Sequence, residues 1–112
     1  MPKFCYLILS KAVPGKEKEF ERWYDERHLS DVVAVPGVVA ARRYRPLVQI
    51  AEEGETPGWL SVAIYELEGD DPIAIVQAIK SRSGSEAMVI DEAFSREGLI
   101  QIVMEPVAAR TR

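Results

Sequence analysis

The sequence has a single cysteine, Cys5, and a single histidine, His28, among its 112 residues. One cysteine excludes an intrachain disulfide framework, which is typical of a protein from a reducing compartment. The sequence also lacks a glycine-rich phosphate loop, a dinucleotide fingerprint and a cluster of cysteine and histidine. We therefore expect no nucleotide, no metal and no other bound cofactor.

Positive charge is scarce, because 14 Lys and Arg stand against 18 Asp and Glu, for a formal net charge of -4. Phosphate backbones bind basic surfaces, so nucleic acid is not an expected partner. The early apolar run from Phe4 to Leu9 is too short to cross a bilayer. It predicts a first strand with a buried Cys5 thiol, not a signal peptide or membrane span, and the protein is expected in the cytoplasm.

The remaining composition, 47% hydrophobic and 29% charged, is that of one globular domain over residues 1–112. Glycine and proline pairs mark the turns, and the apolar patterns between them predict the elements. Asp71 followed by Pro72 is typical of a helix start, and Ser85 is a second candidate cap. The expected strands cover residues 3–11, 38–48, 58–68 and 99–105, and the expected helices cover 16–29, 71 onward and 85–94.

This order, βαββαβ, predicts an α+β ferredoxin-like fold with a four-stranded antiparallel sheet and helices on one face. The strands are apolar on both faces, however, as the alternation of Phe4, Tyr6 and Ile8 with Cys5, Leu7 and Leu9 shows. A second copy of the same sheet is the simplest cover for the other face. The patterning thus predicts a homodimer formed through the sheet face.

Several residues of the first half form a recognisable set: Pro14-Gly15, Phe20, Trp23-Tyr24, His28-Leu29, Val35-Pro36-Gly37 and Arg42-Arg43-Tyr44. With this set the chain resembles the EthD-like branch of the dimeric α+β barrel superfamily. The resemblance implies a homodimer whose two sheets form a barrel, with a small-molecule pocket between each sheet and its own helices. It implies a fold strongly and a reaction only weakly, because members include cofactor-free cyclases, monooxygenases, isomerases and haem enzymes.

His28 is the first candidate for catalysis, because its unperturbed pKa suits proton transfer near neutrality. At α-helical spacing it shares the apolar face of the first helix with Phe20, Trp23 and Tyr24, so the imidazole is expected to point at the sheet. Asp25 or Asp31, three residues to either side, can orient the ring. The alternative is a structural histidine that is satisfied within the core.

Six further residues are candidates for a site around that imidazole. Tyr24 is a candidate hydrogen-bond donor to a substrate oxygen, and the others are candidate substrate contacts: Trp23, Tyr6, Tyr44, Tyr65 and Arg43. Phenols around one imidazole suit enolisation, cyclisation or isomerisation, where a donor holds the developing enolate. The structural alternatives are sheet packing for the aromatic residues and, for the arginine, an ion pair across the dimer with Glu52, Glu53 or Glu55.

Two classes of function follow from these candidates. The first is a cofactor-independent isomerase, cyclase or lyase that acts on an aromatic, polyketide or lactone-like metabolite, with His28 as acid or base. The second is a non-catalytic protein that binds a hydrophobic metabolite for an oxygenase pathway. A haem- or oxygen-using monooxygenase is a third possibility, with His28 as the one available histidine ligand.

Overall fold

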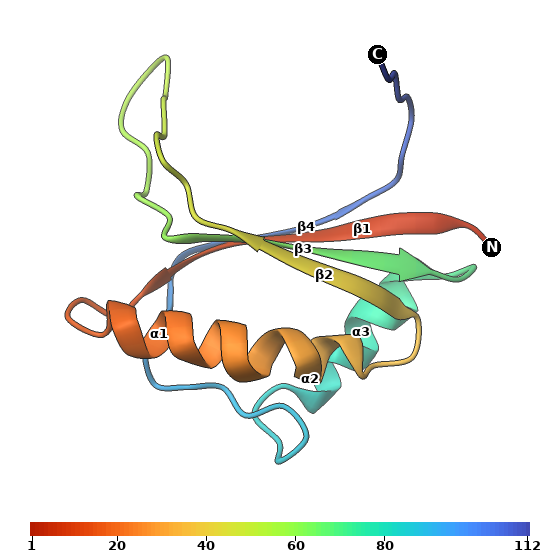
Figure 1. Ribbon diagram of the computed structural model, residues 1–112, viewed down its shortest axis with the longest axis horizontal. Coiled ribbons are helices and arrows are strands. Elements are labelled where there is room, and N and C mark those ends of the chain that lie inside the picture. The colour runs from red at the N-terminus through yellow and green to blue at the C-terminus, as the bar shows by residue number, and fades with distance from the viewer.

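The computed structural model describes residues 1–112 and contains one four-stranded sheet with helical segments on one face (Figure 1). The strand order is β2-β3-β1-β4, and every neighbouring pair is antiparallel. This confirms the predicted ferredoxin-like α+β fold. In chain order the elements are β1 (Lys3–Ala12), α1 (Glu17–Trp23), η1 (Tyr24–His28), α2 (Leu29–Val33), β2 (Val38–Tyr44), β3 (Ser61–Glu68), α3 (Pro72–Arg82) and β4 (Phe94–Met104).

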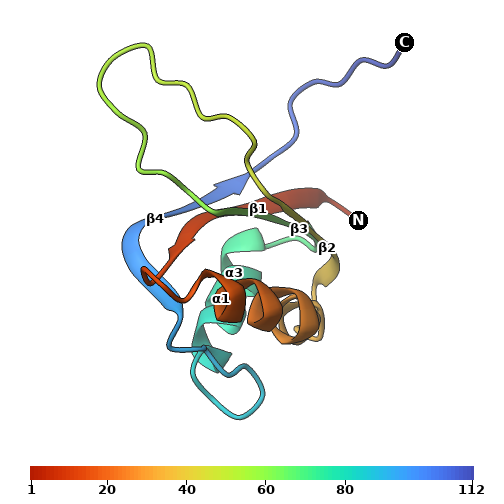
Figure 2. The ribbon, with the colours of Figure 1, turned by 60° about the vertical axis from the view of Figure 1, so that its left-hand side comes forward.

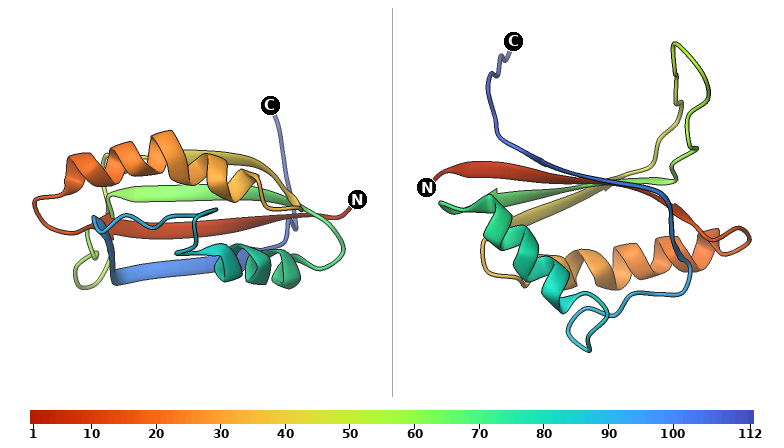
Figure 3. Two further views of the ribbon diagram at one scale, coloured as in Figure 1. Left: turned by 90° about the horizontal axis from the view of Figure 1, so that it is seen from below. Right: turned by 180° about the vertical axis from the view of Figure 1, so that it is seen from behind.

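The molecule has two layers, the sheet and the helical segments, and the helical segments cover only one face of the sheet. Seen from below, the helical segments lie across one face of the sheet (Figure 3, left). The β2–β3 connection and the C-terminal segment both rise from the opposite side of the sheet (Figures 1 and 2). We call that opposite side the open face. None of the helices is long and apolar enough to cross a membrane.

Alternation along the strands separates the two faces. In β1, Tyr6, Ile8 and Ser10 are buried beneath the helices, whereas the residues between them are only half-buried. In β3, the alternate residues from Ser61 to Leu67 are buried in the same way. Successive side chains of a strand point to opposite faces, so the open face carries the other set. In β1, β3 and β4 that set is largely aliphatic: Leu7, Leu9, Val62, Ile64, Ile100 and Ile102.

The C-terminal third differs from the sequence prediction. The expected helix over residues 85–94 is wrong, because the Ser85 hydroxyl donates to the Arg82 carbonyl and does not cap a new helix. The Asp91 carboxylate accepts from the Ala93 amide at 2.8 Å and closes a turn, so that β4 begins at Phe94 and not at Leu99. The Asp71 N-cap of α3 is confirmed, with the Ala74 amide 3.1 Å from the carboxylate.

Gly37 joins α2 to β2 at a position where a side chain has no room. Its φ is +97°, and a Cβ there would lie 2.7 Å from Ile75 Cδ1 of α3. We expect Gly37→Ala to lower the free energy of unfolding by about 2–4 kcal/mol, measured by urea denaturation. Gly15 is the control, since its φ is +86° but no atom lies within 4 Å of the added Cβ. Equal losses in Gly15→Ala and Gly37→Ala would contradict a role for the Ile75 contact.

Candidate functional site

The first helical segment is interrupted by a π-helical turn over the predicted functional residues. In η1 the Leu29 amide donates to the Tyr24 carbonyl, five residues earlier. This wider turn brings residues i and i+5 onto one face, so Trp23 and His28 stack with ring centroids 4.4 Å apart and planes 25° apart. Arg27, which α-helical spacing places on the same face, is exposed. Single π-turns inside helices occur frequently at functional sites.

His28 is held between two aromatic rings and has an unpartnered nitrogen. Its side chain stacks on Trp23 and meets the edge of the Tyr24 ring at 5.1 Å, and the residue is 8% exposed. Burial lowers the pKa of His28 to about 4, against a smaller raising effect of the Asp31 carboxylate. The imidazole is therefore neutral at physiological pH. Its Nδ1 is buried without a hydrogen bond, so neither Asp25 nor Asp31 orients the ring through that atom.

A cavity of about 360 Å³ lies between this turn, the sheet and the end of α3. Its walls are mainly aromatic and aliphatic, and polar groups enter at a few points. The Tyr6 hydroxyl donates to Gln101 Oε1, which leaves the Gln101 amide group free to donate. The lining residues are Tyr6, Ile8, Trp23, Tyr24, His28, Ile79, Lys80, Ser83, Met88, Ile90, Phe94, Arg96, Leu99 and Gln101.

The structure brings four of the seven predicted site residues together in this cavity: His28, Tyr24, Trp23 and Tyr6. The other three do not line it. Tyr65 is completely buried between the sheet and the helices. Tyr44 is 50% exposed, and its alternation with Arg43 places it on the open face, away from the cavity.

Arg43 of strand β2 forms ion pairs with the π-turn and with helix α1. Its guanidinium donates to both carboxylate oxygens of Asp25, at 2.6 and 2.8 Å, and to Glu21 at 3.1 Å. It also lies 5.6 Å from the centre of the Tyr24 ring. The hydrogen bond to Arg43 lowers the pKa of Asp25, so the pair is ionised at neutral pH. Arg43 is thus in an ion pair, but its partners are Asp25 and Glu21 of its own chain and not the expected glutamates of the 49–57 loop.

Four buried hydroxyl groups lie in the layer between sheet and helix without a hydrogen bond of acceptable geometry, on Ser10, Ser61, Tyr24 and Tyr65. Burial raises the pKa of Tyr24 to about 12, whereas the neighbouring Tyr65 and Ser10 hydroxyls lower it slightly. The phenols are therefore neutral at physiological pH. They are close neighbours that interact without forming a complete network.

Tyr65→Phe removes one of these hydroxyl groups, and we expect the free energy of unfolding to change by less than about 1 kcal/mol. Tyr6 is the matched control, because it pairs with Tyr65 across the β1–β3 ladder but its hydroxyl is bonded to Gln101. Tyr6→Phe is expected to lose about 1 kcal/mol. Urea denaturation of the two variants measures the difference. A loss of 2 kcal/mol or more in Tyr65→Phe would mean that its hydroxyl has a strong partner.

Sequence reasoning missed the wall that β4 and α3 contribute, above all Phe94, Arg96, Gln101 and Lys80. Phe94 was expected to end a helix, and Arg96 was in no predicted element. Gln101 had a usable signal: it is the one polar side chain in the run Leu99–Met104. Its alternation with Ile100 and Ile102 places it on the helix-facing side of the sheet.

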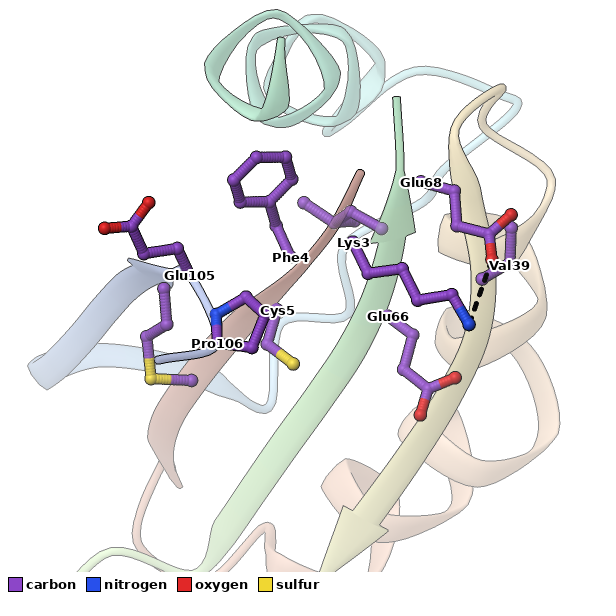
Figure 4. A pocket seen from close by; sticks show the side chains of 10 residues that line it. Lys3, Phe4, Cys5, Val39, Glu66, Glu68, Glu105 and Pro106 are labelled. Carbon is purple, nitrogen blue, oxygen red and sulfur yellow. Dashed lines mark ion pairs between the residues drawn. The ribbon is translucent and has the colours of Figure 1, made fainter. Parts of the chain in front are cut away.

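A second depression, of about 420 Å³, lies where β1 begins (Figure 4). It contains the Cys5 thiol and four charged side chains, of which Lys3 and Glu68 form a 3.8 Å ion pair. Cys5 and Glu66 belong to the open face, and Pro106 of the C-terminal segment forms part of the rim. It contains no histidine. The cavity beside His28 is therefore the better candidate for acid–base chemistry.

Comparison with known proteins was informative at the level of structure only. No protein-family model and no curated protein sequence matches this chain. An EthD-like protein from Ralstonia eutropha has a TM-score of 0.66 and 15% identity, with 99% of this chain and 97% of that chain covered. An EthD family protein from Bacillus halodurans has a TM-score of 0.59 and 18% identity, with coverages of 96% and 100%.

A dimeric ferredoxin-like protein from Jannaschia is also similar, with a TM-score of 0.57, 13% identity and coverages of 93% and 99%. At such identities the likeness concerns the fold. The chain has the ferredoxin-like fold that these EthD-like and dimeric ferredoxin-like proteins have. The resemblance predicted from the sequence is thus confirmed at that level.

Proposed function

We propose that this chain is a small-molecule enzyme in which the neutral His28 imidazole moves a proton without a cofactor. The observation that carries the proposal is the position of the single histidine. Its ring stacks on Trp23 and its Nδ1 is buried without a partner, so Nε2 is the nitrogen left to meet a ligand in a cavity large enough for a one- or two-ring metabolite. A buried polar atom without a partner is costly, and active sites are one place where it is retained.

The surrounding groups suit proton transfer next to a carbonyl. Burial keeps His28 unprotonated at neutral pH, and because a pKa of about 4 makes it a weak base, it suits a substrate carbon whose proton is already strongly acidified. The resulting enolate oxygen needs a donor, and the Gln101 amide is the available group in the cavity, because the Tyr24 hydroxyl is buried beside Tyr65 and Ser10. This supports isomerase, cyclase or lyase chemistry on an aromatic or lactone-like metabolite.

The test is turnover of a panel of aromatic hydroxyketones and unsaturated lactones by purified wild-type protein and by His28→Gln. We expect conversion by the wild type and loss of conversion in His28→Gln, with Tyr65→Phe as an active control. Exchange of a substrate C–H proton with D₂O, followed by NMR, detects the proton transfer directly. Equal exchange rates in wild type and His28→Gln would overturn the role of His28.

Tight binding of a panel compound without any conversion would instead favour a metabolite-binding accessory. In that case the cavity would still be the ligand-binding site, but His28 would have no catalytic role. An absorbance spectrum of the purified protein tests the haem alternative. A Soret band that is lost in His28→Gln would indicate haem bound through His28 and would contradict the cofactor-free mechanism.

We further propose that the functional unit is a homodimer formed through the open face. The face carries a band of aliphatic side chains, and two of them, Ile100 and Ile102, are each 40% exposed. The two segments that rise on that side also carry exposed apolar residues, with Leu47 94% and Val107 89% exposed. Burying these apolar side chains against a second copy of the chain removes them from water and so stabilises the dimer.

A further inference from the structure

We infer that the ligand of the His28 cavity is an aromatic carboxylate whose charged group is bound by Lys80 and Arg96. The inference rests on the proposed function, since it names the class of substrate for the same site. Two observations carry it: the positive charge of the cavity lining, and the contrast between exposed cations at one end of the cavity and buried aromatic rings at the other.

The cavity lining is one-sided in charge. Its 14 residues include Lys80, Arg96 and the histidine but no aspartate or glutamate. The chain as a whole has more acidic than basic residues, so this lining differs in sign from the average surface. None of the ion pairs in the structure uses Lys80 or Arg96. Both cations are therefore available to a ligand.

The two cations come from different walls and lie at the exposed end of the cavity. Lys80 is in the last turn of α3 and Arg96 is in β4, and both residues are exposed. The aromatic residues of the opposite wall, Trp23 and Tyr24, are buried, as is His28. A ligand that fits this gradient has an apolar ring that reaches the imidazole and an anionic group at the mouth.

The chemistry of the two cations favours a carboxylate over a neutral oxygen. Arginine binds a carboxylate through two parallel hydrogen bonds, and lysine adds a point charge beside it. A carboxamide has nearly the same shape but no charge. Its NH₂ group is a hydrogen-bond donor, so it cannot accept a hydrogen bond from either cation. The charge would also orient the ligand, because only one end of the molecule can then point away from His28.

The test compares two probes of nearly equal shape, 1-naphthoate and 1-naphthamide, by isothermal titration calorimetry. We expect wild-type protein to bind the naphthoate at least about tenfold more tightly, and added salt to reduce this preference. The double variant Lys80→Gln/Arg96→Gln is expected to bind the two probes equally. Lys18→Gln/Arg22→Gln is the matched control, because it removes the same two charges from the exposed side of α1 and should retain the preference.

Equal affinities of the two probes in wild type, or a preference that survives in the double variant, would overturn the inference. Failure of both probes to bind would overturn it as well. These outcomes are separate from failure of the proposed function, because they measure affinity and not turnover. A His28→Gln variant that still binds naphthoate in preference to naphthamide supports the charge selection whether or not the protein is a catalyst.

Discussion

Replacing Ile102 by aspartate is expected to convert the proposed dimer into monomers of 12.5 kDa. Ile102 lies opposite Leu7 in the β1–β4 ladder, on the open face of the edge strand β4, and is 40% exposed in the single chain. A carboxylate there would be buried against apolar side chains in both protomers. We expect the dimer dissociation constant to rise at least about 100-fold, which corresponds to about 3 kcal/mol. Sedimentation equilibrium over a range of protein concentrations measures it.

Ile73→Asp is the matched control for this prediction. Ile73 is 52% exposed and lies in the first turn of α3, on the helical side of the molecule. An aspartate near a helix N-terminus is compatible with the helix dipole, so this variant should fold and remain dimeric. Dissociation of both variants, or of neither, would contradict a dimer formed through the open face.

The topology was accessible from the sequence because it depends on alternation and turn chemistry, both of which are local. The turns marked by glycine and proline, the apolar patterns between them and the Asp71-Pro72 helix start were sufficient for the βαββαβ order. Residues 85–94 were assigned incorrectly because Ser85 and Asp91 serve equally well as helix caps and as turn residues. The difference depends on tertiary contacts, such as the 2.7 Å hydrogen bond from the Val13 amide to the Ala93 carbonyl.

The candidate site was accessible only in part, for a related reason. His28, Tyr24 and Trp23 are close in the sequence, so helical periodicity grouped them correctly. The π-turn that stacks Trp23 on His28 has no sequence signature, because it depends on which carbonyl the Leu29 amide reaches. Arg96 and Lys80 belong to elements far away in the sequence. Their place at the cavity mouth depends on where β4 begins and where α3 ends.

The second large effect that we expect is a loss of stability at mildly acidic pH that depends on His28. The pKa of His28 is about 4 in the folded chain and 6.5 in its ordinary state, so the unfolded chain binds a proton at a higher pH. His28 therefore does not lower the free energy of unfolding above pH 6.5, where it is neutral in both states, and lowers it progressively as pH falls from 6.5 toward 4. We expect wild-type protein to lose about 2 kcal/mol at pH 5, relative to pH 7.5, through this one group.

His28→Gln isolates that contribution, because glutamine fills similar space without titrating. Carboxylates with lowered pKa, such as Asp25 and Glu21, also destabilise the fold in acid, but they do so in both proteins and cancel in the difference. Urea denaturation at equal protein concentration should therefore show that the free energy of unfolding of wild type falls about 2 kcal/mol further than that of His28→Gln between pH 7.5 and pH 5. Tyr24→Phe retains the imidazole and should keep the wild-type slope. Parallel curves for wild type and His28→Gln would mean that His28 is solvated and not held as a buried base.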